Sequence, residues 1–304
     1  MDNMITALSP TSLAIFEASP EEFYLQYKLK LKRLPQTKPM SIGSAFDARV
    51  KSYLVGLLGG SQLQDGRFEL NTLYDSQVEI HNRELVRSDS ERLFNAYLAS
   101  GALEELLVTA TRLCSSAKFE LDIRGLVNLE GSEVPIRGKP DVAMKLNNGT
   151  TLIVDFKVNG FYSKAYPKAG YINIRPDRKI HKDAVLGTYA GLTINLAARI
   201  PIEWENQLIT YAWLMGVPVG QEFLAGIEQI VCQGDQYRFA TFRSLIGKQP
   251  QLDLFARYTR AWSVITSEHF FRNMSETDSK TKCNQLDALK SGNSNDQWLL
   301  EHTR

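Results

Sequence analysis

The spacing of apolar and polar positions changes along the chain. From residue 10 to about 115 the pattern predicts helices, with a less regular stretch near 59–80. Runs rich in β-branched and aromatic residues follow, and these predict strands near 117–124, 133–146 and 151–158. The first part of the chain is therefore expected to be helical and the middle part to carry a sheet.

The remainder of the chain alternates between the two patterns. A helix is predicted near 203–216, followed by a second hairpin with its turn at Gly234-Asp235, and helices resume from about 250. The stretch 273–296 is polar, and we expect it to be partly mobile. Strands followed by a helix and further strands, with helices on both sides, predict an α/β sandwich around a mixed sheet.

A hairpin is predicted around Asn147-Asn148-Gly149, between the segments IRGKPDVAMKL and TTLIVDFKV. Alternation along the second segment places Asp155 and Lys157 on one face, about 6–7 Å apart. A two-residue loop at 148–149 would place Asp141 opposite Phe156. A three-residue loop at 147–149 pairs residue 146 with residue 150 and places Asp141 opposite Asp155. We predict this second register, because the first one separates the two carboxylates.

Two carboxylates and a lysine on adjacent strands can hold a divalent cation and a water beside a phosphate. Asp141 and Asp155 are the expected ligands of Mg²⁺ or Mn²⁺, and the carbonyl of Phe156 can add a third oxygen. The cation lowers the pKa of a water and draws charge from a phosphate oxygen, while Lys157 orients that water or stabilises developing negative charge. An Asp and a Lys two apart are usually a solvated face, but the apolar context LIVDFKV favours a functional site.

These residues also carry a family resemblance. GKPD…LIVDFK resembles the signature of the PD-(D/E)XK nuclease superfamily, and three further segments resemble its RecB-like and phage exonuclease branch. They are SPTSLAIFEASPEEFYLQY, then IGSAFDARV with Asp47 where the branch usually has His, and WENQLITYAWLMG with its Gln-x-x-x-Tyr motif. The resemblance covers roughly residues 9–245. It implies a restriction-endonuclease-like core and places Gln207 and Tyr211 near the active site and the DNA.

The motif residues near the N-terminus have a physical basis of their own. Ser19-Pro20-Glu21-Glu22 is a capping box that predicts a helix start, and Phe23 and Tyr27 then share a helix face. Asp47 follows Gly43 by one helical turn, which leaves room for a metal or a phosphate. Asp47 is therefore a candidate metal ligand. The alternative is an exposed helical carboxylate.

Further candidates lie on a predicted helix and on a predicted strand. Gln207 and Tyr211 are four residues apart on an amphipathic helix, so they share a face, and simple packing or capping is the alternative. Glu120 lies on a predicted strand before the hairpin and is a candidate supporting metal ligand. Asp122 competes for that role, and a position on the surface is the stronger interpretation of Glu120.

A basic and aromatic segment follows the strand that carries Lys157. Asp177 is the only acid between Lys157 and Lys182 in the sequence, and the segment contains Pro and Gly residues typical of loops. Such a loop can hold phosphates and stack on unpaired bases, although an ordinary solvated insertion is the alternative. The residues that we assign to DNA binding are Lys139, Tyr162, Lys164, Tyr166, Lys168, Arg175, Arg178 and Lys179.

Composition adds little to this picture. The chain has 304 residues, 43% of them hydrophobic, and a net charge of +1, so overall charge does not indicate nucleic acid binding. The three cysteines are widely spaced and predict neither a zinc site nor an iron–sulfur cluster. No apolar run reaches the roughly 18 residues of a membrane span, and no signal peptide is evident. We therefore expect a cytoplasmic location, in a bacterium or a phage-infected host cell.

These observations predict a PD-(D/E)XK core with a mixed central sheet. Residues 1–115 are expected to form its mainly helical N-terminal part, 116–245 the catalytic core with an insertion at 159–200, and 246–304 a helical extension. The expected function is metal-dependent DNA hydrolysis, first as an exonuclease of recombination, repair or phage DNA processing. A structure-selective or restriction-like endonuclease and a nuclease-fold protein that binds DNA without cutting are the alternatives. The expected partners are DNA and a single-strand annealing or other recombination protein, in an unknown oligomeric state.

Overall fold

The chain forms two compact units. A computed structural model describes residues 5–28, 35–119, 122–160, 171–175, 180–197, 200–233 and 236–267. The first unit consists of Met1–Pro35, Arg124–Arg137 and Asp253–Arg304, and the second consists of Gln36–Ile123 and Gly138–Leu252. Within the described part of the chain, none of the helices combines the length and the apolar character needed to cross a bilayer.

The first unit is mainly helical. It holds α1 (Pro10–Ala18), α2 (Pro20–Phe23), the π-helical turn Tyr24–Lys28, most of the hairpin β2 (Ile123–Leu129) and β3 (Ser132–Gly138), and most of α8 (Lys248–Thr266). Ser19 begins α2, because its hydroxyl accepts a hydrogen bond from the Glu22 N–H at 3.1 Å. Phe23 stacks on Tyr27 with ring centroids 4.9 Å apart. Both the predicted helix start and the shared face are confirmed.

The second unit contains a six-stranded mixed sheet. The strand order is β1 (Cys114–Phe119), β4 (Val142–Leu146), β5 (Thr151–Gly160), β9 (Phe223–Gln233), β10 (Gln236–Ile246) and β6 (Tyr171–Arg175). Only β5 and β9 are parallel among these neighbours, and the predicted hairpin of β9 and β10 is confirmed. A separate small hairpin is formed by β7 (Leu186–Tyr189) and β8 (Leu192–Asn195).

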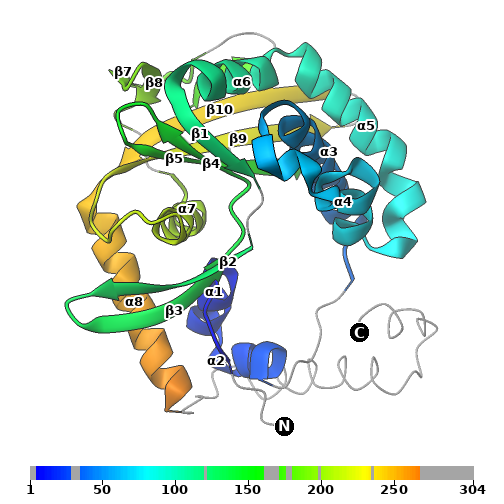
Figure 1. Cartoon of the computed structure of the whole chain (residues 1–304). Helices are drawn as coiled ribbons and strands as arrows, with labels where there is room; N and C mark the ends of the chain where they lie inside the picture. Colours follow the sequence, from blue (N-terminus) through cyan, green and yellow to red (C-terminus); the bar gives the residue numbers. More distant parts are fainter. Residues whose placement is uncertain are drawn as a thin grey trace, which may run out of the picture. The chain divides into compact units, whose positions relative to one another are not determined.

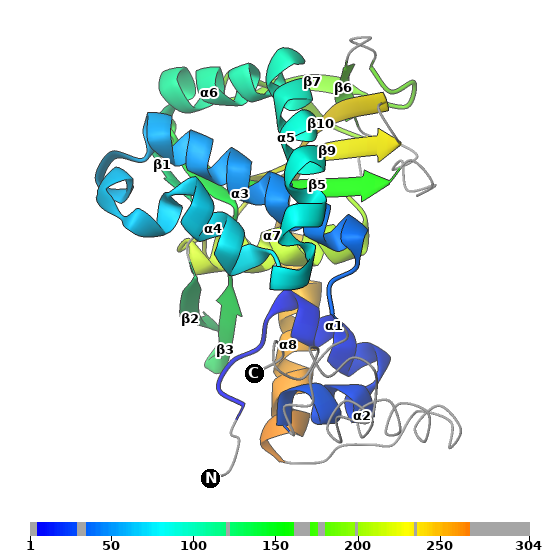
Figure 2. The same cartoon turned by 90° about the vertical axis from the view of Figure 1, so that its right-hand side faces the viewer.

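Helices cover both faces of this sheet (Figure 1). They are α3 (Lys38–Leu58), α4 (Leu70–Gln77), α5 (Arg83–Ala99), α6 (Ala102–Leu113) and α7 (Ile202–Leu214), with short 3₁₀ turns at Gly60–Gln64, Gly66–Phe68 and Ile80–Asn82. Figure 2 shows α3 and α5 crossing β5, β9 and β10 on one face, while α7 lies on the other. The core between α3, α5 and the sheet includes Phe46, Tyr97, Val154 and Phe156.

The register of β4 and β5 agrees with the predicted one. Val142 pairs with Val154 and Lys145 pairs with Thr151. The Leu146 N–H donates a hydrogen bond to the Thr150 carbonyl at 2.8 Å, so the loop has three residues. The same register continued by one position places Asp141 opposite Asp155. The predicted register is therefore confirmed. The prediction that the two carboxylates belong to one site depends on this register.

The structure corrects two strand predictions. The single strand expected at 133–146 is two strands in different sheets, β3 and β4, with Lys139–Asp141 between them. Pro140 has no N–H to donate, so it interrupts the pairing there. The insertion expected at 159–200 is also less irregular than predicted. It contributes β6, which pairs with β10 at the sheet edge, and the β7–β8 hairpin.

Candidate active site

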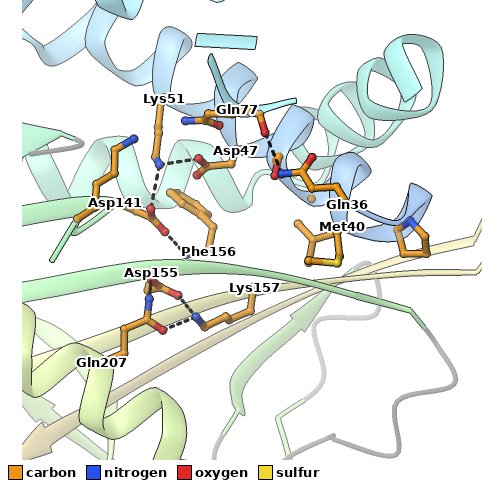
Figure 3. A pocket seen from close by; sticks show the side chains of 15 residues that line it. Gln36, Met40, Asp47, Lys51, Gln77, Asp141, Asp155, Phe156, Lys157 and Gln207 are labelled. Carbon is orange, nitrogen blue, oxygen red and sulfur yellow. Dashed lines mark hydrogen bonds and ion pairs between the residues drawn. The ribbon is translucent and has the colours of Figure 1, made fainter. Parts of the chain in front are cut away.

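A pocket of about 510 Å³ opens beside β5 in the second unit. Its lining combines residues from three helices, α3, α4 and α7, with β5, Gln36 and the segment that precedes β4. The charged and amide side chains that line it include Gln36, Asp47, Lys51, Gln77, Lys139, Asp141, Asp155, Lys157 and Gln207 (Figure 3). The fold thus brings together four of the five predicted catalytic residues and three of the predicted metal-binding carboxylates.

Gln207 connects two residues of β5, Asp155 and Lys157. Lys157 Nζ lies 2.7 Å from Asp155 Oδ2 and donates a hydrogen bond to Gln207 Oε1 at 2.6 Å. Gln207 Nε2 donates to Asp155 Oδ1 at 3.0 Å and to the Tyr211 hydroxyl at 2.8 Å. An amide offers two donors on its nitrogen and an acceptor on its oxygen, and all three are used here. Gln207 therefore holds the Asp155 carboxylate and the Lys157 ammonium in one orientation.

Close packing explains how α7 reaches this position. A Cβ atom at Gly138 would lie 2.7 Å from Tyr211 Cε1, so only glycine lets the Tyr211 ring pass over the GKPD segment. Trp204, one helical turn before Gln207, contributes a ring whose centroid is 6.0 Å from Lys157 Nζ. Sequence analysis missed the roles of Gly138 and Trp204. The spacing of Trp204 from Gln207 is the signal that could have identified it.

Asp141 belongs to a second group of charges, on the α3 side of β5. Its Oδ2 accepts a hydrogen bond from the Phe156 N–H at 2.9 Å. Lys51 Nζ lies 3.0 Å from Asp141 Oδ1 and 2.5 Å from Asp47 Oδ2. Lys51 was not among the predicted site residues, although its position four residues after Asp47 places it on the same face of α3.

The two carboxylates of the hairpin differ in their electrostatic surroundings. Burial acts to raise the pKa of Asp141, but the Lys51 ammonium and the Phe156 N–H outweigh it and hold the pKa below its usual range. Burial, together with the negative charge of Asp141, raises the pKa of Asp155 to about 7, and Lys157 opposes this only in part. Burial raises the pKa of Tyr211 as well, with Asp155 adding to the effect, so its hydroxyl stays protonated. Asp155 is therefore the carboxylate whose charge is least compensated.

The residues present fit a hard divalent cation. Asp155 is only 3% exposed, and its Oδ2 accepts no hydrogen bond of regular geometry although it forms the ion pair with Lys157. Among the described residues, no group of three or more His, Cys, Asp or Glu side chains is arranged to hold a metal. A cation here would rely on Asp141, Asp155, a carbonyl such as that of Phe156, and water. Mg²⁺ accepts such a set, since it usually keeps several waters beside one or two carboxylates.

The remaining predicted residues divide into three groups. Lys139 is exposed and lines both this pocket and a second one of about 260 Å³, which Asp122 also lines. Arg175 is instead engaged within the fold: its guanidinium donates to Glu105 and to the Ser100 carbonyl, both at 2.8 Å. We therefore withdraw Arg175 from the expected DNA contacts. The predicted residues outside the described part of the chain are Glu120, Tyr162, Lys164, Tyr166, Lys168, Arg178 and Lys179.

Sequence and structure comparisons relate the chain to known proteins to different extents. No curated protein is significantly similar in sequence to the chain. Two solved structures are similar at 13% identity over 86% of this chain. One is SSO0001, with 88% of its chain covered and a TM-score of 0.31, and the other is a candidate exonuclease from Eubacterium rectale, with 82% covered and a TM-score of 0.45.

The family assignment comes from the sequence profile. The profile of the PD-(D/E)XK nuclease superfamily matches residues 7–169, which is more than half of the chain. The match includes Asp141, Asp155 and Lys157, the residues that face the pocket from the predicted hairpin. The chain belongs to the PD-(D/E)XK nuclease superfamily.

Proposed function

We propose that this protein is a metal-dependent deoxyribonuclease that hydrolyses phosphodiester bonds. One observation carries the proposal: Asp155 and Lys157, held together by Gln207, line the same pocket as Asp141. Two acidic groups and a protonated amine at one pocket suit phosphoryl chemistry, because they can bind a cation and stabilise negative charge. Membership of a nuclease superfamily points to the same chemistry.

Each residue has a proposed role. Asp141, Asp155 and the Phe156 carbonyl would hold Mg²⁺ or Mn²⁺. When bound, such a cation draws charge from the phosphate and lowers the pKa of a nearby water. The Lys157 ammonium, fixed by Gln207 and Asp155, would orient the attacking water or stabilise the charge that develops on the phosphate. Tyr211 would hold the Gln207 amide in place by accepting its second hydrogen bond.

DNA would reach the pocket past the basic residues that border it. Lys139 is exposed at the pocket and suits a contact with a phosphate. The basic and aromatic residues that follow β5, from Tyr162 to Lys179 but without Arg175, would extend this contact by holding phosphates and stacking on bases. Because the net charge of the chain is only +1, such local clusters have to supply the attraction.

Within this class we propose an exonuclease of recombination, repair or phage DNA processing, in the cytoplasm of a bacterium or an infected cell. The support is the resemblance of four sequence segments, in the same order, to the RecB-like and phage exonuclease branch. A single-strand annealing protein or another recombination protein would be its partner.

A cleavage assay tests this proposal. Purified protein is incubated with end-labelled linear and covalently closed circular DNA, single- and double-stranded, with Mg²⁺, Mn²⁺ or EDTA. We expect linear DNA to be degraded from its ends only when a divalent ion is present, and the Lys157→Ala variant to be inactive. Cleavage of closed circles would favour an endonuclease. Binding of DNA without cleavage under any of these conditions would overturn the assignment as an enzyme.

A further inference from the structure

The ammonium of Lys51 lies between two carboxylates of the candidate site (Figure 3). Asp47 Oδ2 is 2.5 Å from Nζ and Asp141 Oδ1 is 3.0 Å from it. Asp47 and Lys51 are one turn apart on α3, while Asp141 belongs to the segment before β4. A lysine from the helix thus connects one expected metal ligand with another.

Lys51 is held in this position by its environment. Its side chain is only 3% exposed. A buried ammonium is costly unless anionic partners compensate for the lost hydration, and Asp47 and Asp141 provide that compensation. The ammonium and its two carboxylates are therefore a permanent part of the apo site rather than a surface ion pair that exchanges freely with solvent.

This arrangement conflicts with a divalent ion shared by Asp47 and Asp141. Mg²⁺ binds its oxygen ligands at about 2.0–2.1 Å. An ion at that distance from the same two oxygens would occupy the volume that Lys51 Nζ already fills. Asp155 forms its ion pair with Lys157 instead, at 2.7 Å, so its carboxylate does not depend on Lys51 for a partner.

Charge balance leads to the same conclusion. Three carboxylates line the pocket close to β5, those of Asp47, Asp141 and Asp155, and two ammonium groups contact them, those of Lys51 and Lys157. These five side chains carry one net negative charge when all are ionised; the exposed Lys139, which also lines the pocket, is not counted with them. One divalent ion would leave one positive charge, which matches a phosphodiester, whereas two ions would leave three.

We propose that Lys51 takes the place of a second divalent ion, so that the site binds a single metal at Asp141 and Asp155. Asp47 then acts as the anchor of Lys51 and not as a metal ligand. This inference rests on the proposed function, since it concerns the metal that the nuclease would use. The sequence predicted that Asp47 binds metal and assigned no role to Lys51. In this inference Lys51 has a defined role and Asp47 holds it in position.

The test is the number of Mn²⁺ ions bound per chain, measured by electron paramagnetic resonance titration and by calorimetry without DNA. We expect one ion for the wild type and two for Lys51→Met, which keeps the length of the side chain but removes its charge. The second ion should disappear in the Lys51→Met/Asp47→Asn double variant. Lys145→Met is the matched control, because Lys145 is an exposed lysine of β4 whose ammonium contacts Thr151 and does not line the pocket.

Thermal unfolding of the apo and Mn²⁺-loaded proteins provides a second readout. Lys51→Met should unfold at a lower temperature than the wild type without metal, since Asp47 and Asp141 lose their shared partner, and Mn²⁺ should raise its midpoint more than that of the wild type. If Lys51→Met does not fold, Asp47→Asn decides: it should still bind one ion with little change in affinity, and loss of that ion would overturn the inference.

Other results separate this inference from the proposed function. Two ions per wild-type chain, or one ion in a folded Lys51→Met variant, would overturn the role of Lys51 even if DNA is cleaved. One ion per chain in a protein that does not cleave DNA would count against the nuclease function and leave the stoichiometry in place.

Discussion

Lys157 Nζ donates a hydrogen bond to Gln207 Oε1 at 2.6 Å, although the two residues are 50 positions apart in the chain. The contact joins β5 to α7, and the same amide binds Asp155. Neither the strand nor the helix can define the site alone. The position of the ammonium depends on an amide that is itself held by the Tyr211 hydroxyl.

This dependence predicts a specific kinetic defect in Gln207→Leu. The variant removes the acceptor of Lys157 and the donor of Asp155 while leaving both charged groups in place. We expect kcat to fall by about 10- to 100-fold with KM nearly unchanged, because a misplaced catalytic group costs rate rather than binding. Tyr211→Phe is the milder control, since it removes only the outer hydrogen bond. A Gln207→Leu defect confined to KM would show that Gln207 binds DNA instead of positioning Lys157.

The chemistry itself predicts a loss of activity without loss of fold. Lys157→Ala should lower kcat by at least about 100-fold, the range seen when a group that stabilises developing charge is removed.

Asp155→Asn should abolish Mn²⁺ binding as well as activity. Because burial and the nearby Asp141 raise the pKa of Asp155, its ionised form is costly in the apo protein. Asp155→Asn should therefore unfold at a higher temperature than the wild type at pH 8 without metal, and a lower midpoint would contradict this electrostatic account.

Much of this site could be predicted from sequence because it depends on local rules. The Asn147-Asn148-Gly149 turn and the alternation along one strand left two registers open, and the expectation that Asp141 and Asp155 share one site selected the register that the structure has. Pro140 could also have shown that the strand is interrupted, since it cannot donate a hydrogen bond.

The residues that sequence analysis missed depend on tertiary contacts. Lys51 acquires a role only because α3 crosses the sheet beside Asp141, which no spacing in the sequence reveals. Arg175 was assigned to DNA because it lies in a basic stretch, but its partner Glu105 is 70 positions away on α6. Local charge patterns cannot distinguish an arginine that binds phosphate from one that is paired inside the fold.

A buried carboxylate away from the candidate active site predicts a pH-dependent stability. Glu228 on β9 is 3% exposed, accepts a hydrogen bond from Thr241 at 2.9 Å and lies 3.7 Å from Arg243 Nη2. Burial raises the pKa of Glu228 to about 7, although Arg243 opposes the shift. A raised carboxyl pKa favours the protonated form in the folded state. This contribution to stability is therefore complete below the unfolded pKa of about 4.3 and is lost as pH rises to about 7.

Glu228→Gln should remove that pH dependence, since glutamine resembles the protonated acid. Urea unfolding between pH 4.5 and 8 measures it as the difference in unfolding free energy between wild type and variant. We expect the wild type to lose stability relative to the variant up to about pH 7 and the difference to be constant above it. A difference that does not change with pH would indicate that Arg243 keeps Glu228 ionised throughout.

The basic segment and Arg175 should respond differently to loss of charge. In an inactive Lys157→Ala background, removing the charges of Arg178 and Lys179 should weaken DNA binding and flatten its salt dependence. Each lost phosphate contact reduces the slope of log K against log salt by roughly 0.7–0.9. Arg175→Ala should leave that slope unchanged and lower the thermal midpoint, because Glu105 loses an ion pair that is largely shielded from solvent.

The aromatic residues of the same segment give a separate prediction. Tyr162→Ala or Tyr166→Ala should weaken single-strand binding by about 1–3 kcal/mol if a base stacks there.

Gly138 provides the last prediction, because it tests whether the position of α7 controls the site. A methyl group at this position would meet the Tyr211 ring at 2.7 Å and Leu214 Cδ1 at 2.9 Å, closer than Cβ atoms are found in folded proteins. Gly138→Ala should therefore displace Tyr211, cost about 1–3 kcal/mol of stability and lower kcat through the Gln207 amide. Gly66→Ala is the control, since a Cβ there meets no atom within 4 Å. Wild-type kcat in Gly138→Ala, at a temperature where the variant is folded, would show that Lys157 does not depend on α7 for its position.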